Sequence, residues 1–436
     1  MRQMAWVLAM MLCMALAVMP TTASDYTLQV FGNANMDDTI DEDDIEYARG
    51  IIGGTNEATE LDDADYDGDV DEDDIAQIEL IMRGEEKELT LIDMAGRIVT
   101  IPRPIERVVS ASLPDTRIIV ALDGCDRLKG SEIAETGSSL SDWTSGFNIG
   151  EMQYACGGAI KDVVDVGWSG TNAETIAMLK PDVIFASSGT EADALQDKIG
   201  VSALVSRPSR TENMTLMDQH SQHIRFAGIV LGRDAEAEEL ISFMEEKLAL
   251  VTDISSQIDD SKKPRVYFAA RTSIEPDVTK TTGYYDAIEL AGGINVAKEC
   301  ATSTSEFEVS KEQIVVWDPD IILLKCTNLS SETQYTREMV LSDPLFQKGG
   351  VNAVQNGAVY YCMATSRGYS IQRLIPETMY LAKIFHPEEF ADLDLETEGN
   401  EIMKKFFHED DLYSWLADNK GYIRDLIADP PVAKNW

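Results

Sequence analysis

Basic residues, histidine and closely spaced cysteines are scarce in this 436-residue sequence. Lys and Arg number 36 against 77 Asp and Glu, so the formal charge is −41. Because binding to a polyanion needs a basic surface, this balance excludes nucleic acid as a partner and disfavours an anionic lipid surface. The sequence has four histidines, and no two of its six cysteines form a Cys-x-x-Cys pair, which argues against a zinc or redox motif.

Motifs for catalysis are missing as well. The sequence has no Gly-x-Ser-x-Gly elbow, phosphate-binding loop or His-Glu-x-x-His pair, so we do not predict an enzyme. His220 and His223 are spaced to share one helix face. We expect both to lie away from the strand ends of the fold, and we therefore do not predict a metal site at this pair.

Long apolar runs are absent except at the N-terminus. There Arg2 precedes an apolar stretch from Met4 to Met19, and small residues follow it. This order is typical of a secretory signal, and about 16 residues is short for a membrane span. We therefore predict an export signal over residues 1–24 and a protein that is extracellular, on the cell surface or periplasmic. Cleavage of the signal, its retention as an anchor, and the pairing of the five later cysteines all stay open.

Acidic residues are concentrated in one short segment. Residues 25–88 hold 23 acidic and three basic side chains. Within them, residues 33–44 and 63–74 repeat one pattern, with oxygen side chains at positions 1, 3, 5, 9 and 12. A calcium loop needs this spacing, because a hard cation takes six to eight oxygen ligands. The predicted ligands are Asn33, Asn35, Asp37, Asp41 and Asp44 in the first loop, and Asp63, Asp65, Asp67, Asp69, Asp71 and Asp74 in the second.

Each acidic loop is followed by a segment with helical periodicity that ends near a glycine. This tandem arrangement resembles a dockerin module, which binds two calcium ions and docks on a cohesin domain. Gly68 occupies the sharp turn at position 6 of the second loop, where the first loop has Asp38, so we predict two Ca²⁺ sites of which the second is stronger. The paired Asp43-Asp44 and Asp73-Asp74 depart from the usual dockerin contact positions, which favours calcium binding over cohesin binding. The alternative is a solvated acidic linker.

The rest of the chain alternates between short β-branched runs and helical segments. This alternation predicts an α/β fold whose two lobes contain parallel sheets. Residues 214–258 contain no proline, and glycine interrupts them at Gly228 and Gly232. They predict a long helix, broken near Gly232, that joins the lobes. We assign residues 89–212 to the first lobe, 213–262 to the connecting helix and 263–436 to the second lobe with C-terminal helices.

Six segments of the large module occur in the order found in one known family. They are Gly96–Pro102 with Arg107–Ser110, Asn172–Ile176 with Leu179–Ile184, Lys263–Val266, Asp286–Val296, Val309–Ile314 with Trp317–Ile322, and Asp343–Phe346 with Ala353–Tyr360. Over about residues 95–390 the chain resembles the class III substrate-binding proteins of ABC importers, the receptors for iron chelates and cobalamin. The resemblance implies a metal-chelate ligand, such as an iron siderophore, haem or a corrinoid, and an ABC permease as partner. It also implies that Glu174 and Glu312 dock on that permease.

Candidate ligand residues lie in the loops that follow the predicted strands, because open α/β sheets bind ligands at the carboxyl ends of their strands. Arginine suits a carboxylate or phosphate on a chelate, and aromatic rings suit a flat ligand. The candidates are Pro114, Trp143, Trp168, Ser188, Arg207, Arg271, Thr327, Arg367 and Tyr369. A single stiff helix between the lobes predicts a small closure on binding. The alternative functions are a cohesin-docking surface protein whose lobes do not serve import, and an exported enzyme on the same scaffold.

Overall fold

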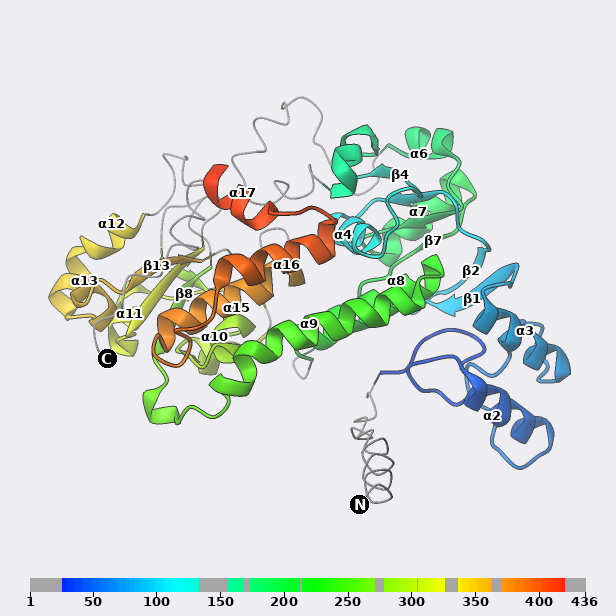
Figure 1. Ribbon diagram of the computed structural model, residues 1–436, viewed down its shortest axis with the longest axis horizontal. Coiled ribbons are helices and arrows are strands. Elements are labelled where there is room, and N and C mark those ends of the chain that lie inside the picture. The colour runs from blue at the N-terminus through cyan, green and yellow to red at the C-terminus, as the bar shows by residue number, and fades with distance from the viewer. Residues whose placement is uncertain are drawn as a thin grey trace, which may run out of the picture. The chain divides into compact units, whose positions relative to one another are not determined.

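The computed structural model describes residues 26–132, 155–167, 172–209, 211, 214–270, 278–303, 305–325, 336–362 and 370–419. The chain divides into two compact units, Met1–Leu91 and Ile92–Trp436. Among the described residues, no helix combines the length and the apolar character needed to cross a bilayer. Figure 1 labels the helices and strands.

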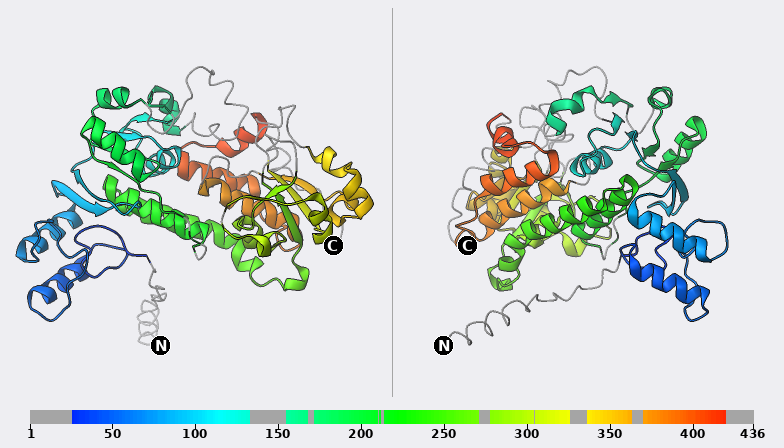
Figure 2. Two further views of the ribbon diagram at one scale, coloured as in Figure 1. Left: turned by 180° about the vertical axis from the view of Figure 1, so that it is seen from behind. Right: turned by 45° about the vertical axis from the view of Figure 1, so that its right-hand side comes forward.

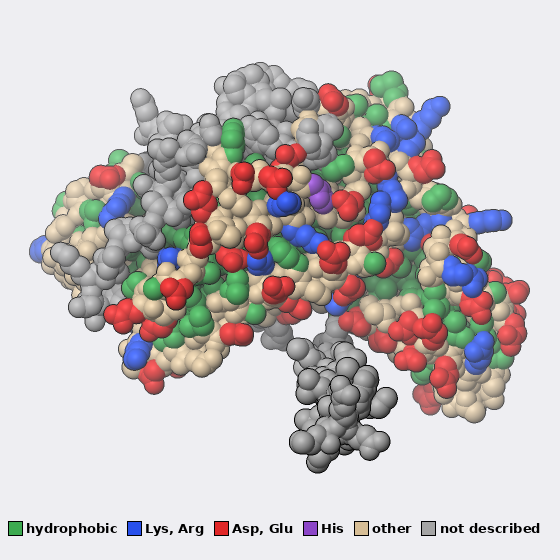
Figure 3. All heavy atoms as spheres, viewed as in Figure 1, with side chains coloured by type: hydrophobic (Ala, Val, Ile, Leu, Met, Phe, Trp, Pro, Cys, Tyr) green, Lys and Arg blue, Asp and Glu red, His purple; other side chains and the backbone are tan. Residues whose placement is uncertain are grey.

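From residue 26 onward, where the structure describes it, the smaller unit contains two helices, α2 (Glu42–Ile52) and α3 (Glu72–Arg83), each preceded by an acidic loop. Both helices begin with a capping box, in which the N-cap aspartate and the aspartate three residues later satisfy backbone N–H groups. A small apolar core that includes Ile45, Ala48, Ile75 and Ile78 holds the two helices together. Acidic side chains dominate the visible face of this unit in Figure 3.

The first lobe of the larger unit is built on a fully parallel five-stranded sheet of order β5-β4-β3-β6-β7. Its strands are β3 (Val108–Ser110), β4 (Leu128–Ser131), β5 (Val164–Asp165), β6 (Val183–Phe185) and β7 (Ala203–Leu204). Strand β1 (Glu88–Ile92) spans the boundary between the two units. The lobe also contains strand β2 (Ile98–Pro102) and the helices α4 (Leu113–Ala121), η1 (Ala155–Asp162), α6 (Ala173–Leu179) and α7 (Gly189–Ile199). The β-branched runs at β3 and β6 are fully buried, as expected for parallel strands covered on both faces.

The second lobe repeats this plan with a parallel four-stranded sheet of order β10-β8-β12-β13. Its strands are β8 (Arg265–Ala269), β10 (Ile294–Asn295), β12 (Ile321–Lys325) and β13 (Val359–Cys362), and β9 (Lys280–Thr281) pairs with β11 (Phe307–Glu308). Its helices are η3 (Asp260–Lys262), α10 (Asp286–Leu290), η4 (Lys298–Cys300), α11 (Lys311–Trp317), α12 (Arg337–Leu341), α13 (Pro344–Gly349), α14 (Asn352–Gln355) and α15 (Ile371–Phe385). The prediction of an α/β fold with parallel sheets in two lobes is confirmed.

The segment between the lobes forms two helices rather than one, as the break near Gly232 predicts. They are α8 (Leu216–Leu231) and α9 (Asp234–Ser255), and Gly232 between them takes the left-handed conformation with φ 62°. Arg103 and Arg127 donate hydrogen bonds to the last carbonyl groups of α8. The 22 residues of α9 span roughly 33 Å at 1.5 Å per residue. Figures 1 and 2 show α9 running from α8 in the first lobe toward the second lobe.

A second helix also links the lobes. The C-terminal helix α16 (Leu395–Phe407) packs on α15 and α17 (Leu412–Asn419), and it also packs on α4 of the first lobe. His408, directly after α16, lies 2.9 Å from the carbonyl oxygen of Val120 through its Nε2. The expectation that one helix alone bridges the lobes is therefore wrong, because the C-terminal segment crosses back to the first lobe.

Candidate functional site

Three loops meet at the carboxyl edge of the first sheet, because β3, β6 and β7 are parallel neighbours. Pro114 lies in the first turn of α4, directly after β3, and is half-buried. Ser188 is the exposed N-cap of α7 after β6, and Arg207 is half-buried after β7. The structure therefore brings these three predicted ligand residues to one edge. The other six, Trp143, Trp168, Arg271, Thr327, Arg367 and Tyr369, lie outside the described residues.

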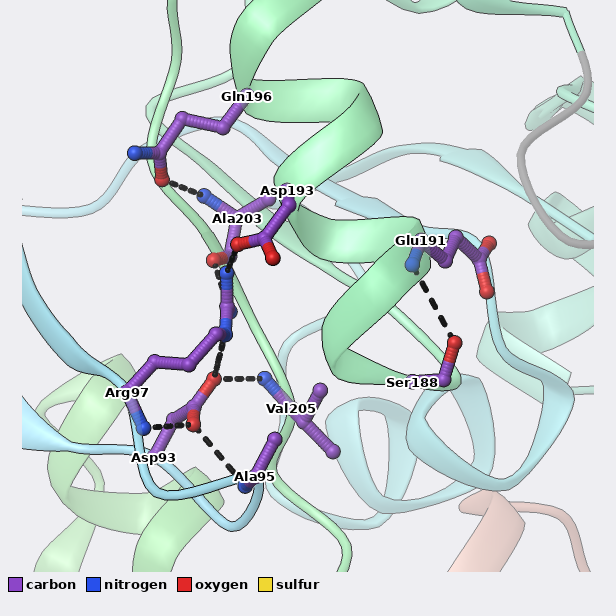
Figure 4. Close-up of polar contacts among 9 residues, drawn as sticks. All are labelled: Asp93, Ala95, Arg97, Ser188, Glu191, Asp193, Gln196, Ala203 and Val205. Carbon is purple, nitrogen blue, oxygen red and sulfur yellow. Dashed lines mark hydrogen bonds and ion pairs between the residues drawn. The ribbon is translucent and has the colours of Figure 1, made fainter.

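An ion pair between buried Asp93 and partly exposed Arg97 anchors the hairpin turn beside this edge (Figure 4). The carboxylate of Asp93 accepts hydrogen bonds from Nη2 of Arg97 at 2.6 Å and from the backbone N–H of Val205 at 3.0 Å. The Arg97 guanidinium continues to Asp193 at 2.7 Å and to the carbonyl oxygen of Ala203 at 2.7 Å. These contacts tie the hairpin to α7 and β7, so the loops that follow β6 and β7 rest on a fixed support.

The N-terminus of α7 lies at the carboxyl edge of the first sheet, directly after β6. The hydroxyl of Ser188 accepts a hydrogen bond from the backbone N–H of Glu191 at 3.3 Å. The Glu191 carboxylate in turn accepts one from the N–H of Ser187 at 3.1 Å. Burial raises the pKa of Glu191 above its ordinary value, and the negative charge of Asp115 adds to the shift. The predicted ligand residue Ser188 thus also has a structural role as the cap of α7.

A buried Asp–His–Ser cluster lies directly beneath the same edge. Nε2 of His223, on α8, lies 2.7 Å from Oδ1 of Asp115 and 3.0 Å from Oγ of Ser206, and Ser206 also donates a hydrogen bond to Asp115. All three residues are at most 2% exposed. Burial alone would raise the pKa of Asp115, but the hydrogen bond and charge of His223 outweigh it, with help from Ser112 and Ser206, and hold the pKa below its ordinary value.

This cluster is the part of the site that sequence reasoning missed. We expected both histidines to lie away from the strand ends, and for His223 this expectation is wrong, because it bonds to residues that directly follow β3 and β7. The sequence gives no clear signal for this pair, because Asp115 precedes Thr116-Arg117 and His223 follows the polar run Asp218–Gln222. The two residues are 108 positions apart, so their meeting depends on how α8 packs against the sheet.

Polar groups also join the two lobes near their strand ends. Nη1 of Arg117, on α4, donates to Oγ of Ser370 at 2.9 Å, and both residues are at most 1% exposed. On the second lobe, Tyr285 stacks on Phe268 with ring centroids 4.1 Å apart. Burial raises the pKa of Tyr285 well above its ordinary value, and the charge of Glu377 contributes in the same direction. The Arg117–Ser370 hydrogen bond therefore ties α4 of the first lobe to the start of α15 in the second.

A groove of about 420 Å³ lies elsewhere, where the end of α4 meets α9 and α16. Its lining is Ala121, Asp123, Glu236, Glu239, Phe243, Glu401, Lys404, Lys405 and His408. Charged pairs such as Lys405 with Glu239 already occupy much of its wall. Of the predicted ligand residues that the structure describes, Pro114, Ser188 and Arg207, none lines this groove, so we do not treat it as the ligand site.

Comparison with known families decides which class of protein carries this architecture. A sequence model described as periplasmic binding protein matches residues 130–365, which is more than half of the chain. The chain belongs to the periplasmic binding protein family. It is thus an extracytoplasmic substrate-binding protein of an ABC transporter and not an enzyme, as the sequence predicted.

Several relatives within the periplasmic binding protein family are named by their solutes. The molybdate-binding protein MolA of Haemophilus influenzae is 25% identical over 340 residues, which is 73% of this chain and 90% of MolA. A cobalamin-binding protein of Halobacterium salinarum is 25% identical over 221 residues, which is 50% of this chain and 57% of that protein. An ABC transporter substrate-binding lipoprotein of Bacillus subtilis, YvrC, is 23% identical over 310 residues, 70% of this chain and 87% of YvrC.

Solved structures of the periplasmic binding protein family share the fold. MolA bound to molybdate superposes with a TM-score of 0.54 and 24% identity, covering 74% of this chain and 98% of MolA. CeuE of Helicobacter pylori with Ni(II) bound gives a TM-score of 0.53 and 18% identity, covering 75% of this chain and 99% of CeuE. Both alignments leave about a quarter of the present chain uncovered.

The two glutamates predicted to dock on a permease occupy equivalent places in this periplasmic binding protein. Glu174 lies in the first turn of α6 and Glu312 in the first turn of α11, and both are exposed. Asn172 and Ser310 cap the two helices, each accepting a hydrogen bond from the backbone N–H three residues later. Each glutamate is therefore held on a short, capped helix and is accessible to a partner.

The acidic loops of the smaller unit fold alike but not identically. In each loop the side chain at position 1 accepts a hydrogen bond from the N–H at position 5, namely Asn33 from Asp37 at 3.2 Å and Asp63 from Asp67 at 3.0 Å. Gly68 at position 6 of the second loop has φ 101°, a conformation open to glycine, whereas Asp38 does not adopt positive φ. The backbone of the two loops therefore differs at the sharp turn.

The second loop brings three carboxylates together. Oxygen atoms of Asp63, Asp65 and Asp67 all lie within 4.8 Å of one another. The last predicted ligands, Asp44 and Asp74, are buried and accept backbone hydrogen bonds from the loop and from the helix cap. Burial raises the pKa of Asp44 to about 6. A cation at either loop would offset the cost of burying these negative charges.

Proposed function

We propose that this protein is the receptor that captures an anionic, metal-containing solute for an ABC importer. The leading candidates are metal chelates, namely an iron siderophore, haem or a corrinoid. The observation that carries the proposal is the edge of the first sheet, where α4 and α7 begin and where Arg207 follows the neighbouring strand β7. Helix N-termini and a guanidinium both favour negative charge, which a carboxylate-bearing chelate supplies.

A molybdate-type oxyanion is the second candidate. Similarity to MolA extends over 90% of that protein, and an oxyanion needs the same helix ends and guanidinium as a chelate carboxylate. The two candidates differ in size, since a chelate also needs flat apolar surface for stacking. A ligand panel separates them directly.

The test is isothermal titration and thermal unfolding of the full chain with ferric siderophores, haem, cobalamin and molybdate. A ligand at about 100 times its Kd should add about 2.7 kcal/mol of stability. Arg207→Ala should weaken the ligand at least tenfold, whereas Arg83→Ala, in the smaller unit, should leave its affinity unchanged. A panel in which no compound changes the unfolding temperature would overturn the proposal.

We also propose that Glu174 and Glu312 bind basic side chains of the permease. Charge reversal of both should abolish uptake of the solute into cells, and the affinity of the receptor for that solute should stay the same because neither glutamate is among the predicted ligand residues. Glu338→Arg is the matched control, since Glu338 is likewise an exposed glutamate in the first turn of a short helix, α12. Loss of solute affinity in the double variant would refute this role.

We propose further that the smaller unit binds two Ca²⁺ ions, the second more tightly. Positions 1, 3, 5, 9 and 12 hold five carboxylates in the second loop and three in the first, and a hard cation binds more tightly to more charge. Calorimetry should resolve two affinities; Asp67→Ala should remove the tighter one and Asp37→Ala the weaker one. A single affinity, or loss of the weaker site in Asp67→Ala, would contradict the assignment.

The alternative function, docking on a cohesin, uses the same unit. Its support is the tandem loop-and-helix repeat, in which α2 and α3 share one core. A cohesin pull-down with calcium and with a chelator tests it. Capture only in calcium supports docking, which is compatible with import by the lobes, and no capture in either condition refutes it.

A further inference from the structure

The two lobes repeat a surface as well as a fold. Helix α6 of the first lobe and α11 of the second each have seven residues and end in a residue in the left-handed conformation, Lys180 with φ 47° and Asp318 with φ 44°. In each lobe a Pro-Asp pair follows and leads into the next strand. Non-glycine residues seldom adopt this conformation, so its recurrence at matched positions marks a true structural repeat.

Side-chain contacts extend the repeat. Asp182 accepts a hydrogen bond from the N–H of Arg107 at 2.8 Å, and Asp320 accepts one from the N–H of Arg265 at 2.9 Å. The two arginines then cap the C-termini of the helices, with Arg107 donating to the last carbonyl of α6 at 2.9 Å and Arg265 to that of α11 at 3.0 Å. The same set of aspartate and arginine contacts therefore holds α6 in the first lobe and α11 in the second.

The exposed faces of the two helices match as well. Met178 lies one turn after Glu174, and Val316 lies one turn after Glu312, so each apolar side chain is on the same helix face as its glutamate. Met178 is 74% exposed and Val316 is 76% exposed. Other exposed large apolar side chains of the described residues range from 38% to 52%. The two most exposed ones therefore occupy equivalent positions in the two lobes.

We infer that Met178 and Val316 are the apolar contacts of a duplicated docking surface, and that each inserts into an apolar recess beside a basic side chain on the permease. The inference rests on the proposed import function and deepens it. Single exposed apolar residues are common. A highly exposed apolar residue at the same position in both lobes is explained by a partner that has the same apolar recess twice. The acidic chain favours a basic partner surface, and the apolar side chain supplies the desolvated contact next to the ion pair.

Photo-crosslinking tests the duplicated surface. Benzoylphenylalanine is placed at position 178, 316 or 339, and each full-length variant is irradiated on right-side-out membrane vesicles of the source organism. Position 339 is the control, because Met339 is exposed on α12 outside the repeat. We expect positions 178 and 316 to crosslink the same stretch of one membrane-spanning polypeptide, and position 339 not to. Crosslinks to different polypeptides, none at 178 and 316, or equal capture at 339 overturn the inference.

Binding measurements separate this inference from the proposed function. Met178→Ser and Val316→Ser together should weaken binding to the same vesicles about tenfold or more, since two apolar side chains lose their contacts, with Met339→Ser unchanged. Unfolding temperatures should stay the same, because these side chains are largely exposed. If charge reversal of Glu174 and Glu312 stops uptake but the serine variants bind normally, only the apolar contacts are refuted. If the glutamate variants also transport normally, the docking role in the proposed function fails too.

Discussion

Loss of the His223 imidazole should destabilise the larger unit more than any loss of a surface ion pair. His223 and Asp115 have side chains that are 0% and 1% exposed, with 2.7 Å between Nε2 and Oδ1. Replacement by leucine keeps a similar volume but leaves the carboxylate of Asp115 buried without the imidazole that lies within hydrogen-bond distance of it. Removal of one partner from a buried pair costs about 3–5 kcal/mol. The free energy of unfolding, measured by urea denaturation with circular dichroism at neutral pH, should fall by that amount.

The effect should depend on pH. In the parent protein the pKa of Asp115 lies below its ordinary value of 3.8, so the ionised carboxylate contributes stability above about pH 4, and this contribution is lost as the pH falls through the lowered pKa. In His223→Leu the pKa of Asp115 should rise, because burial is then no longer outweighed, and the variant should lose stability as the pH increases above about 4. The stability difference between the two proteins should therefore widen from about pH 4 to pH 7.

Two further variants make the reasoning refutable. Asp115→Asn in the His223→Leu background removes the uncompensated charge, so the double variant should be more stable than His223→Leu alone. Glu238→Gln breaks the Arg225–Glu238 pair, whose glutamate side chain is 48% exposed, and should cost less than about 1 kcal/mol. A cost below about 1 kcal/mol for His223→Leu, or no recovery in the double variant, would show that the pair does not hold the strand edge together.

Three other predictions concern contacts between the helices and lobes. Arg117→Met removes a charged hydrogen bond to buried Ser370 and should cost about 1.5–3 kcal/mol in urea denaturation, with broader unfolding if the lobes separate first. Gly228→Ala should lower the unfolding temperature, because a Cβ there would lie 2.7 Å from that of Ala237 at the α8–α9 junction; an unchanged temperature would mean that the junction relaxes. Lys247→Met should cost only about 1 kcal/mol, since its two glutamate partners on α16 are partly exposed; a cost several times larger would contradict this.

Much of the larger unit was predictable because its strands are short, buried β-branched runs. β12 and β13 are short apolar runs, Ile321–Lys325 and Val359–Cys362, of the kind that the alternating pattern predicts as strands. β4 gives a weaker signal, because Lys129-Gly130 interrupts its apolar pattern. Gly130 is explained only by packing, since a Cβ there would lie 2.6 Å from Leu179 and 2.8 Å from Val166. Local sequence patterns thus predicted strands, but they did not show where close packing against neighbouring elements requires a glycine.

The site was predictable only where it depends on strand order. Pro114, Ser188 and Arg207 lie at one edge because parallel neighbours end together, and that follows from the α/β pattern. The pairing of Asp115 with His223 does not follow from it, because it depends on the angle at which α8 packs on the sheet. The contact of α16 with α4 was missed for the same reason, since amphipathic periodicity shows that a helix face is buried but not against which partner.

The path of α16 has a consequence for biosynthesis. The surface of α4 that α16 covers belongs to the first lobe, while α16 follows the second lobe in the sequence. When an exported chain emerges from its N-terminus, this surface of the first lobe stays open to water until the second lobe and α16 have also crossed. Chaperones on the far side of the membrane would meet the first lobe in this half-finished form.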